Sequence, residues 1–115
     1  MIARHLQTKI MHRVVEHNGT IYLGGVVADD CSQDMKGQMQ QVCERIDDLL
    51  AQVGSSKEKL LTAMIYISDF SQKNRMNEAW IDWLPGENFP TRATIGVAEL
   101  GEDVLVEVVV SAAKS

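Results

Sequence analysis

A single carboxylate interrupts the most apolar stretch of the chain. The stretch runs from Val104 to Val110, and Glu107 is its only polar residue. Its valines and leucine predict a strand that is apolar on both faces. An unpaired carboxylate in such a strand would carry a large desolvation cost or stay protonated. Glu107 therefore needs a partner, and the nearest cation upstream in the sequence is Arg92, fifteen residues away.

The sequence leaves two interpretations of Arg92 and Glu107 open. We expect residues 92–98 and 104–112 to form strands of one hairpin around Gly101. Glu107 then lies opposite position 94 or 95, and Arg92 is about 7–10 Å away along the strand if both share a face. The two residues can form a structural ion pair. Alternatively, Arg92 binds a ligand carboxylate with its planar guanidinium, and Glu107 orients a water molecule or acts as a general base.

Apolar periodicity and turn signals predict the other elements. Residues 33–53 carry one apolar stripe at helical spacing, with Ser32 as the N-cap and Gly54 as the stop. A second helix runs from a capping box at Asp69 to about Leu84. Further strands are predicted at 11–17, 20–23 and 60–67, and an additional short strand can form at 2–6.

The order β-β-α-β-α-β-β predicts one α+β domain over residues 1–115, with both helices on one face of a sheet. Two helices cover one face only. The last strand is apolar on both faces, since Val106 and Val108 point one way while Leu105 and Val109 point the other. The second face therefore needs a cover, and the simplest one is another copy of the chain. The sequence predicts an obligate homo-oligomer.

Charge and residue spacing argue against nucleic-acid binding, membrane binding and metal binding. The net charge of −5 repels phosphate backbones and acidic membrane surfaces, so we expect no binding to nucleic acid or membrane. No apolar stretch approaches the roughly 20 residues of a membrane helix, and no signal peptide is visible, which predicts a cytoplasmic protein. The cysteines and histidines lack metal-binding spacing, so no metal site is expected.

Three further positions carry candidate chemistry. Asn77 is either a solvated helix residue or a polar side chain that reaches a cleft between subunits. Thr94 shares strand parity with Arg92 and is most simply a β-branched strand residue. Gly24-Gly25 follows a strand but lacks a phosphate-loop pattern, so it predicts a bulge or a close backbone approach.

The chain resembles the Rid family, the reactive intermediate deaminases of RidA/YjgF type, along nearly its whole length. The most specific part is Phe89-Pro90-Thr91-Arg92 followed by Val106-Glu107-Val108, which is similar to the family's F-P-x-R…V-x-I/V-E signature. The stretch from Glu78 to Trp83 looks closest to the YoaB-like branch. Further matches are Gly25, Gly54, Asp69, Asn77, Leu100 and Asp103-Val104.

The resemblance implies a chorismate-mutase-like fold and a homotrimer whose sheets line a central barrel, with clefts between neighbouring subunits. It implies a hydrolase of the 2-iminobutanoate/2-iminopropanoate deaminase type. Such an enzyme converts enamines and imines such as 2-aminoacrylate to 2-keto acids and ammonia, without a metal or organic cofactor. Arg92 would bind the substrate carboxylate and Glu107 would position the attacking water. The cleft would also be lined by Asn77, Thr94 and Gly24.

The sequence differs from the best-known branch of the family at the expected cleft. Gly24 and Thr94 stand where that branch has a serine and a cysteine, and its Gly-Pro-Tyr segment has no counterpart. The substrate range is therefore open. A non-catalytic protein that binds a small carboxylate and regulates a partner is an alternative. An endoribonuclease and a chorismate mutase have less support, because the chain is acidic and Arg92 is the only well-placed cation.

Overall fold

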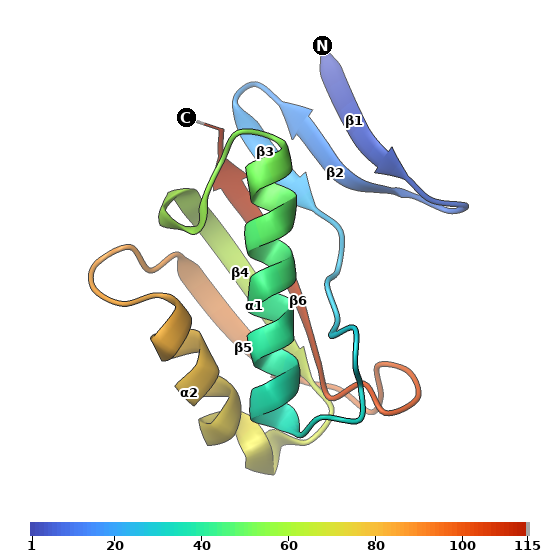
Figure 1. The fold of residues 1–115 in the computed structure, drawn as a ribbon, viewed down its shortest axis with the longest axis vertical. Helices are drawn as coiled ribbons and strands as arrows, with labels where there is room; N and C mark the ends of the chain where they lie inside the picture. The colour runs from blue at the N-terminus through green and yellow to red at the C-terminus, as the bar shows by residue number, and fades with distance from the viewer. Residues whose placement is uncertain (115) are drawn as a thin grey trace.

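Both helices lie on the same face of a mixed six-stranded sheet (Figure 1). The computed structural model describes residues 1–114, and its shortest dimension is 20 Å, enough for one sheet and one helix layer. The strands are β1 Ile2–Gln7, β2 His12–His17, β3 Thr20–Leu23, β4 Leu60–Ile67, β5 Thr91–Gly96 and β6 Val106–Ala113. The helices are α1 Met35–Gln52 and α2 Lys73–Trp83, with 3-10 turns η1 Lys57–Lys59 and η2 Phe70–Gln72. The predicted α+β class is confirmed.

Helix α1 begins two residues later than predicted. The expected N-cap, Ser32, lies in the preceding turn, where its hydroxyl donates to Asp30 at 2.6 Å. Asp34 caps the helix instead and accepts a backbone hydrogen bond of 2.9 Å from the first turn. The predicted stop is confirmed, because Gly54 adopts a φ of 78°, a left-handed conformation that suits glycine.

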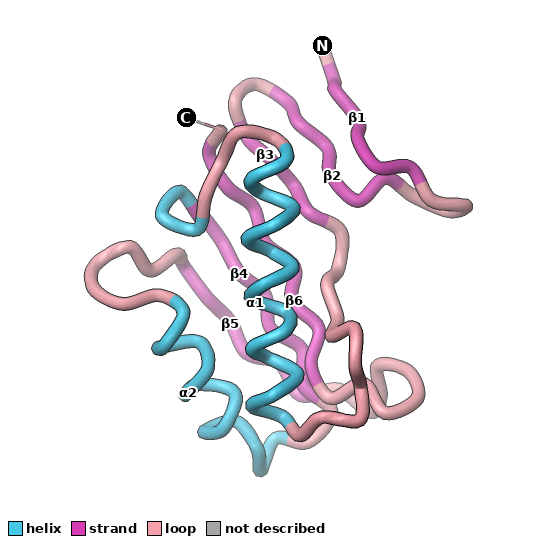
Figure 2. The backbone as a smooth tube through the Cα atoms, in the orientation of Figure 1, coloured by secondary structure: helices cyan, strands magenta, loops and turns pink. Residues whose placement is uncertain are grey.

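The sheet order is β1-β2-β3-β6-β4-β5, so the predicted hairpin of β5 and β6 is wrong. Strand β4 lies between them, parallel to β5 and antiparallel to β6, and α2 supplies the crossover that a parallel pair needs. The loop from β5 to β6 passes the end of β4 (Figure 2), where Val97 and Leu105 hydrogen-bond to Ile67 and Ser68. The more apolar strand β6 takes the central position, whereas the polar β5 takes an edge.

The side of the sheet that faces the helices forms the core. Strands β4 and β6 place Ala63, Ile65, Val108 and Val110 there, and each is at most 2% exposed. The other face is open. On it, Tyr22 is 52% and Ile95 is 37% exposed, and Met64, Tyr66 and Val109 are half-buried. As predicted, the two helices cover only one face of an apolar sheet.

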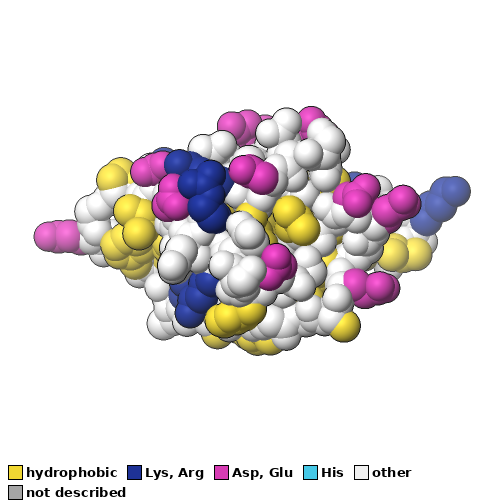
Figure 3. Space-filling model, turned by 90° about the horizontal axis from the view of Figure 1, so that it is seen from below, with side chains coloured by type: hydrophobic (Ala, Val, Ile, Leu, Met, Phe, Trp, Pro, Cys, Tyr) yellow, Lys and Arg dark blue, Asp and Glu magenta, His cyan; other side chains and the backbone are white. Residues whose placement is uncertain are grey.

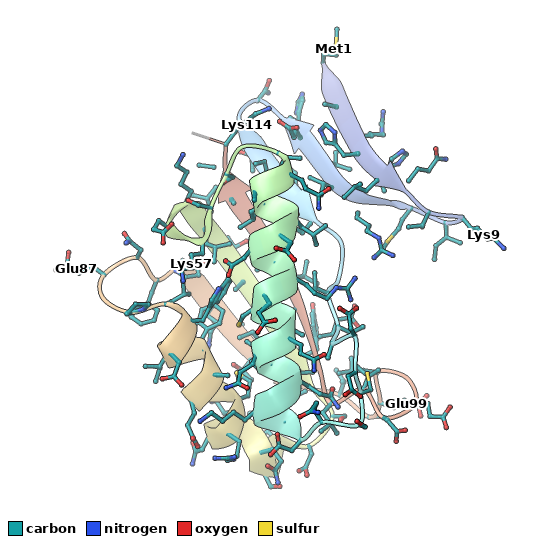
Figure 4. The ribbon with its side chains drawn as sticks, in the orientation of Figure 1. Met1, Lys9, Lys57, Glu87, Glu99 and Lys114 are labelled. Atoms are coloured by element: carbon teal, nitrogen blue, oxygen red, sulfur yellow. The ribbon has the colours of Figure 1, made fainter. Side chains whose placement is uncertain are left out.

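The hairpin of β1 and β2 extends beyond the helices, and Lys9 marks its tip in Figure 4. The additional short strand expected at 2–6 is present as β1. Its apolar side chains are poorly covered, with Ile2 46% and Leu6 41% exposed. The outer edge of β1 and the outer edge of β5 are thus the two free edges of the sheet.

One polar side chain lies fully inside the core. The amide nitrogen of Gln38 donates to the carbonyls of Gln33 and Asp103 at 3.0 and 2.9 Å. Its amide oxygen accepts from the backbone N–H of Leu105 at 2.9 Å, and the side chain is 0% exposed. Gln38 therefore joins the loop before α1 to the loop before β6, two residues from Glu107.

Replacing Gln38 by methionine is expected to lower the free energy of unfolding by about 2–4 kcal/mol. Methionine keeps the volume but leaves buried backbone groups without partners. Urea denaturation followed by circular dichroism measures the change. The control is Gln40→Met on the exposed side of the same helix, which should change stability by less than about 0.5 kcal/mol. Equal effects of the two substitutions would contradict the proposed role of Gln38.

Candidate functional site

Arg92 projects from the edge strand β5 toward helix α2. Its backbone is in register with Ala63, which is 1% exposed and faces the helices, so Arg92 lies on the same side. The guanidinium carbon lies 5.3 Å from the centroid of the Trp80 ring on α2. Among residues 1–114, no carboxylate lies within ion-pair distance of this guanidinium. The structural ion pair with Glu107, one of the two interpretations that the sequence leaves open, is therefore absent from residues 1–114.

Arg92 is half-buried, so its guanidinium is partly removed from water but still reachable. Burial lowers the pKa of Arg92 below its usual value, because desolvation disfavours the charged form. An arginine nevertheless stays protonated at neutral pH. A charged and planar group with little solvent around it favours a small carboxylate, which can accept two parallel hydrogen bonds from it.

Asn77 and Thr94 lie on the same side of the sheet as Arg92. Thr94 is two residues further along β5, in register with the buried Ile65, and Asn77 is on α2 one turn before Trp80. The Asn77 Oδ1 and Thr94 Oγ1 atoms are buried, and neither has a hydrogen-bond partner within residues 1–114. Since buried polar atoms are normally paired, these two mark the space between α2 and β5 as a candidate ligand site.

Glu107 lies on the opposite, open face of the sheet. It is in register with Tyr66 of β4, which in turn is in register with Ile95 of β5. Tyr66 is three residues from Ala63, and strand positions an odd number of residues apart face opposite sides. The expected shared face of Arg92 and Glu107 is thus wrong within one chain. Glu107 is half-buried at the open face, so it does not require the internal counter-ion that a fully buried strand would demand.

Gly24 and Gly25 form the predicted bulge beside Glu107. Between the paired residue Tyr22 and the isolated bridge at Val26, this segment advances four residues while β6 advances three. A side-chain carbon on Gly25 would clash with the carboxylate oxygen Oε2 of Glu107. The glycine leaves room for this carboxylate to lie against the backbone. Gly25 is therefore the glycine that lies against Glu107, whereas a side-chain carbon on Gly24 would meet Met11. Arg92 and Thr94 lie on the helix side of the sheet.

Basic side chains near the start of the helices have acidic neighbours. At the end of the molecule seen in Figure 3, Lys and Arg side chains lie next to Asp and Glu side chains. Lys36 and Arg75 contact Glu78 at 3.3 and 3.1 Å, and Arg75 also lies 3.7 Å from Asp34. Arg92 differs from these two residues, because its half-buried guanidinium lies beside an aromatic ring and has no carboxylate partner among residues 1–114.

The described residues offer neither a metal-binding cluster nor a membrane-spanning helix. Within residues 1–114, no group of three or more His, Cys, Asp or Glu side chains is arranged to hold a metal ion. Neither helix in this part of the chain combines the length and apolar character that a membrane span needs.

The contact between Trp80 and Arg92 is the feature that sequence reasoning missed. From the sequence alone, a tryptophan in the apolar stripe of this helix predicts a core or interface anchor. The sequence does place a tryptophan one turn after Asn77 on the second helix. Its contact with Arg92 could be inferred only from the strand order, because this order places Arg92 on the edge strand beside α2.

Known proteins match this chain over almost its full length. A family profile described as endoribonuclease L-PSP matches residues 7–114. A RutC family protein from Haemophilus ducreyi is 35% identical over 113 residues, 98% of this chain and 97% of that protein. The RutC family protein YoaB from Escherichia coli is 32% identical over 100 residues, 87% of each chain. The crystal structure of a YjgF family member from Neisseria meningitidis has a TM-score of 0.95 at 30% identity, over 100% of this chain and 96% of that one. Because sequence and fold agree along the same residues, the chain belongs to the Rid family, also called the YjgF or RutC family.

Proposed function

We propose that the protein hydrolyses small enamines and imines derived from amino acids, such as 2-aminoacrylate, to 2-keto acids and ammonia. The observation that carries the proposal is the half-buried guanidinium of Arg92, which has no acidic partner among residues 1–114. Membership in the Rid family supports the same chemistry. Arg92 anchors the substrate carboxylate, and Glu107 positions the attacking water.

The proposed reaction requires only a few functional groups from the protein. An imine carbon is already electrophilic, and more so when its nitrogen is protonated. The site must hold the carboxylate, place one water about 3 Å from the carbon, and provide a group that accepts a proton from this water. A guanidinium fork and a single carboxylate meet these needs, so the proposal includes no metal or organic cofactor.

Arg92 and Glu107 can serve one substrate only if they come from different copies of the chain. Within one chain they face opposite sides of the sheet. We place the site where β5 and α2 of one protomer meet the open sheet face of the next. Arg92, Asn77 and Thr94 then come from one protomer, and Glu107 and Gly24 come from its neighbour. Three copies related by rotation would close this head-to-tail contact and cover the open face.

A coupled assay tests the proposed activity. An amino-acid oxidase generates imines from its substrates, and the purified protein is added at increasing concentration. We expect the release of ammonia and keto acid to accelerate in proportion to the added protein. Unchanged kinetics, together with measurable binding of a 2-keto acid, would favour the non-catalytic carboxylate-binding alternative instead.

Mixing two inactive variants tests the shared site. Arg92→Ala and Glu107→Ala proteins are each expected to be inactive alone. If they are unfolded together and refolded as mixed oligomers, about one quarter of the sites receive both intact residues from different copies. The activity should therefore recover to about a quarter of the wild-type value under the same protocol. No recovery, with mixed oligomers verified by mass spectrometry, would contradict a site shared between copies of the chain.

RNA cleavage has less support than imine hydrolysis, although the matching family profile is described as an endoribonuclease. The chain carries a net charge of −5, and the basic residues Lys36 and Arg75 are paired with acidic side chains. RNA cleavage that persists through purification and disappears in the Arg92→Ala variant would revive this activity.

A further inference from the structure

We infer that Trp80 is a positioning residue for Arg92, because its indole ring holds the guanidinium in place and leaves the fork free for a carboxylate. This inference rests on the proposed function and adds a determinant of substrate affinity to it. The juxtaposition that carries it is the guanidinium carbon 5.3 Å from the centroid of the Trp80 ring.

The Trp80 ring is itself held firmly. It is 4% exposed and makes an edge contact with Trp83, with ring centroids 5.8 Å apart and planes at 64°. The indole N–H of Trp83 donates to both carboxylate oxygens of Asp47 on α1, at 3.1 and 3.0 Å. The support of Arg92 therefore runs from α1 through two aromatic rings on α2 to the edge strand β5.

An aromatic ring suits this task better than an acidic residue. A carboxylate beside Arg92 would stabilise the cation but would occupy the N–H groups that the substrate needs. The face of an indole ring attracts a cation through its quadrupole and accepts no conventional hydrogen bond. Trp80 can thus stabilise a half-buried guanidinium in the absence of ligand and leave its donors available. Without the ring, the long arginine side chain would have to be ordered by the ligand itself.

Substitutions at Trp80 separate positioning from core packing. Titration calorimetry with 2-oxobutanoate as the probe is expected to show about tenfold weaker binding for Trp80→Leu, which removes the ring. The KM for the imine should rise by a similar factor, and kcat should change little, because the ring supports binding of the carboxylate. Trp80→Phe keeps an aromatic face and should weaken binding only about twofold to threefold.

Leu50→Ala is the control for core packing, because it truncates a side chain of α1 that is 0% exposed and leaves both aromatic rings of α2 in place. It should lower the thermal unfolding midpoint about as much as Trp80→Leu, yet leave the dissociation constant of 2-oxobutanoate within about twofold. If Leu50→Ala weakens binding as much as Trp80→Leu does, or if Trp80→Leu binds as well as wild type, the inference is overturned.

Fluorescence provides a readout that does not depend on a stable leucine variant. The chain has two tryptophans, so Trp83→Phe leaves Trp80 as the only one. Adding 2-oxobutanoate should change the emission of this variant at saturation. In the reverse variant, Trp80→Phe, the remaining Trp83 should respond much less. Equal responses, or none in the variant that retains Trp80, would contradict the inference.

The Arg92→Lys protein distinguishes this inference from the proposed function. If 2-oxobutanoate binds normally to Arg92→Lys, the proposed function itself fails. If binding is lost in Arg92→Lys but is insensitive to Trp80→Leu, only the role of Trp80 is removed.

Discussion

Replacing Arg92 by lysine is expected to lower kcat/KM for imine hydrolysis roughly a hundredfold. Lysine keeps the positive charge but loses the planar fork that donates hydrogen bonds to both oxygens of a carboxylate. Arg92 lies on an edge strand and makes no ion pair with a residue in 1–114, so the fold and the proposed oligomer should persist. The oxidase-coupled assay measures the rate, and circular dichroism with size-exclusion chromatography measures the fold and assembly.

Arg75→Lys is the control for this experiment. Arg75 is exposed on α2 and paired with Glu78, so its replacement should leave both the rate and the fold unchanged. Normal turnover in Arg92→Lys would remove Arg92 from the proposed role. A loss of rate in both variants would indicate a general disturbance of α2 and its surroundings.

Replacing Glu107 by glutamine is expected to lower kcat about a hundredfold to a thousandfold, with a smaller change in KM. The amide has the same shape and fits against Gly25, but it cannot accept a proton from the attacking water. Because the proposal assigns the substrate carboxylate to Arg92, which is intact in this variant, binding of 2-oxobutanoate should be nearly retained. Steady-state kinetics and titration calorimetry measure the two quantities separately.

Glu102→Gln, in the exposed loop before β6, is the matched control and should be fully active. A kcat within about twofold of wild type in Glu107→Gln would contradict a role for this carboxylate in proton transfer. A large rise in the dissociation constant would instead assign Glu107 to substrate binding.

Local patterns predicted the individual elements closely. Strands β3 and β4 have the expected bounds. Strand boundaries depend on the apolar pattern and on the turn residues that flank it, and both involve only a few neighbouring positions. The start of α1 differs by two residues, since Ser32 and Asp34 can both accept a capping hydrogen bond and the loop geometry selects between them. The bulge at Gly24-Gly25 was also predictable from the sequence alone.

The neighbours of each strand could not be predicted in the same way. Two strands separated by a short loop favour a hairpin on local grounds, but β4 inserts between β5 and β6. The insertion places the most apolar strand at the centre and the polar strand at the edge, a preference that depends on the whole sheet. A change of neighbour also changes the register, and with it the face that a side chain occupies.

The amino-acid sequence determined the α+β class and the apolar face of the sheet that the two helices leave uncovered. It also identified the two charged residues on which the proposed chemistry depends. Periodicity and residue chemistry are local properties, so they can be read without coordinates. Only the tertiary structure decided that Arg92 stacks on Trp80 and that Glu107 faces the other way. The physical reason is that strand pairing results from competition among segments far apart in the chain, and the winning arrangement sets which side of the sheet each side chain reaches.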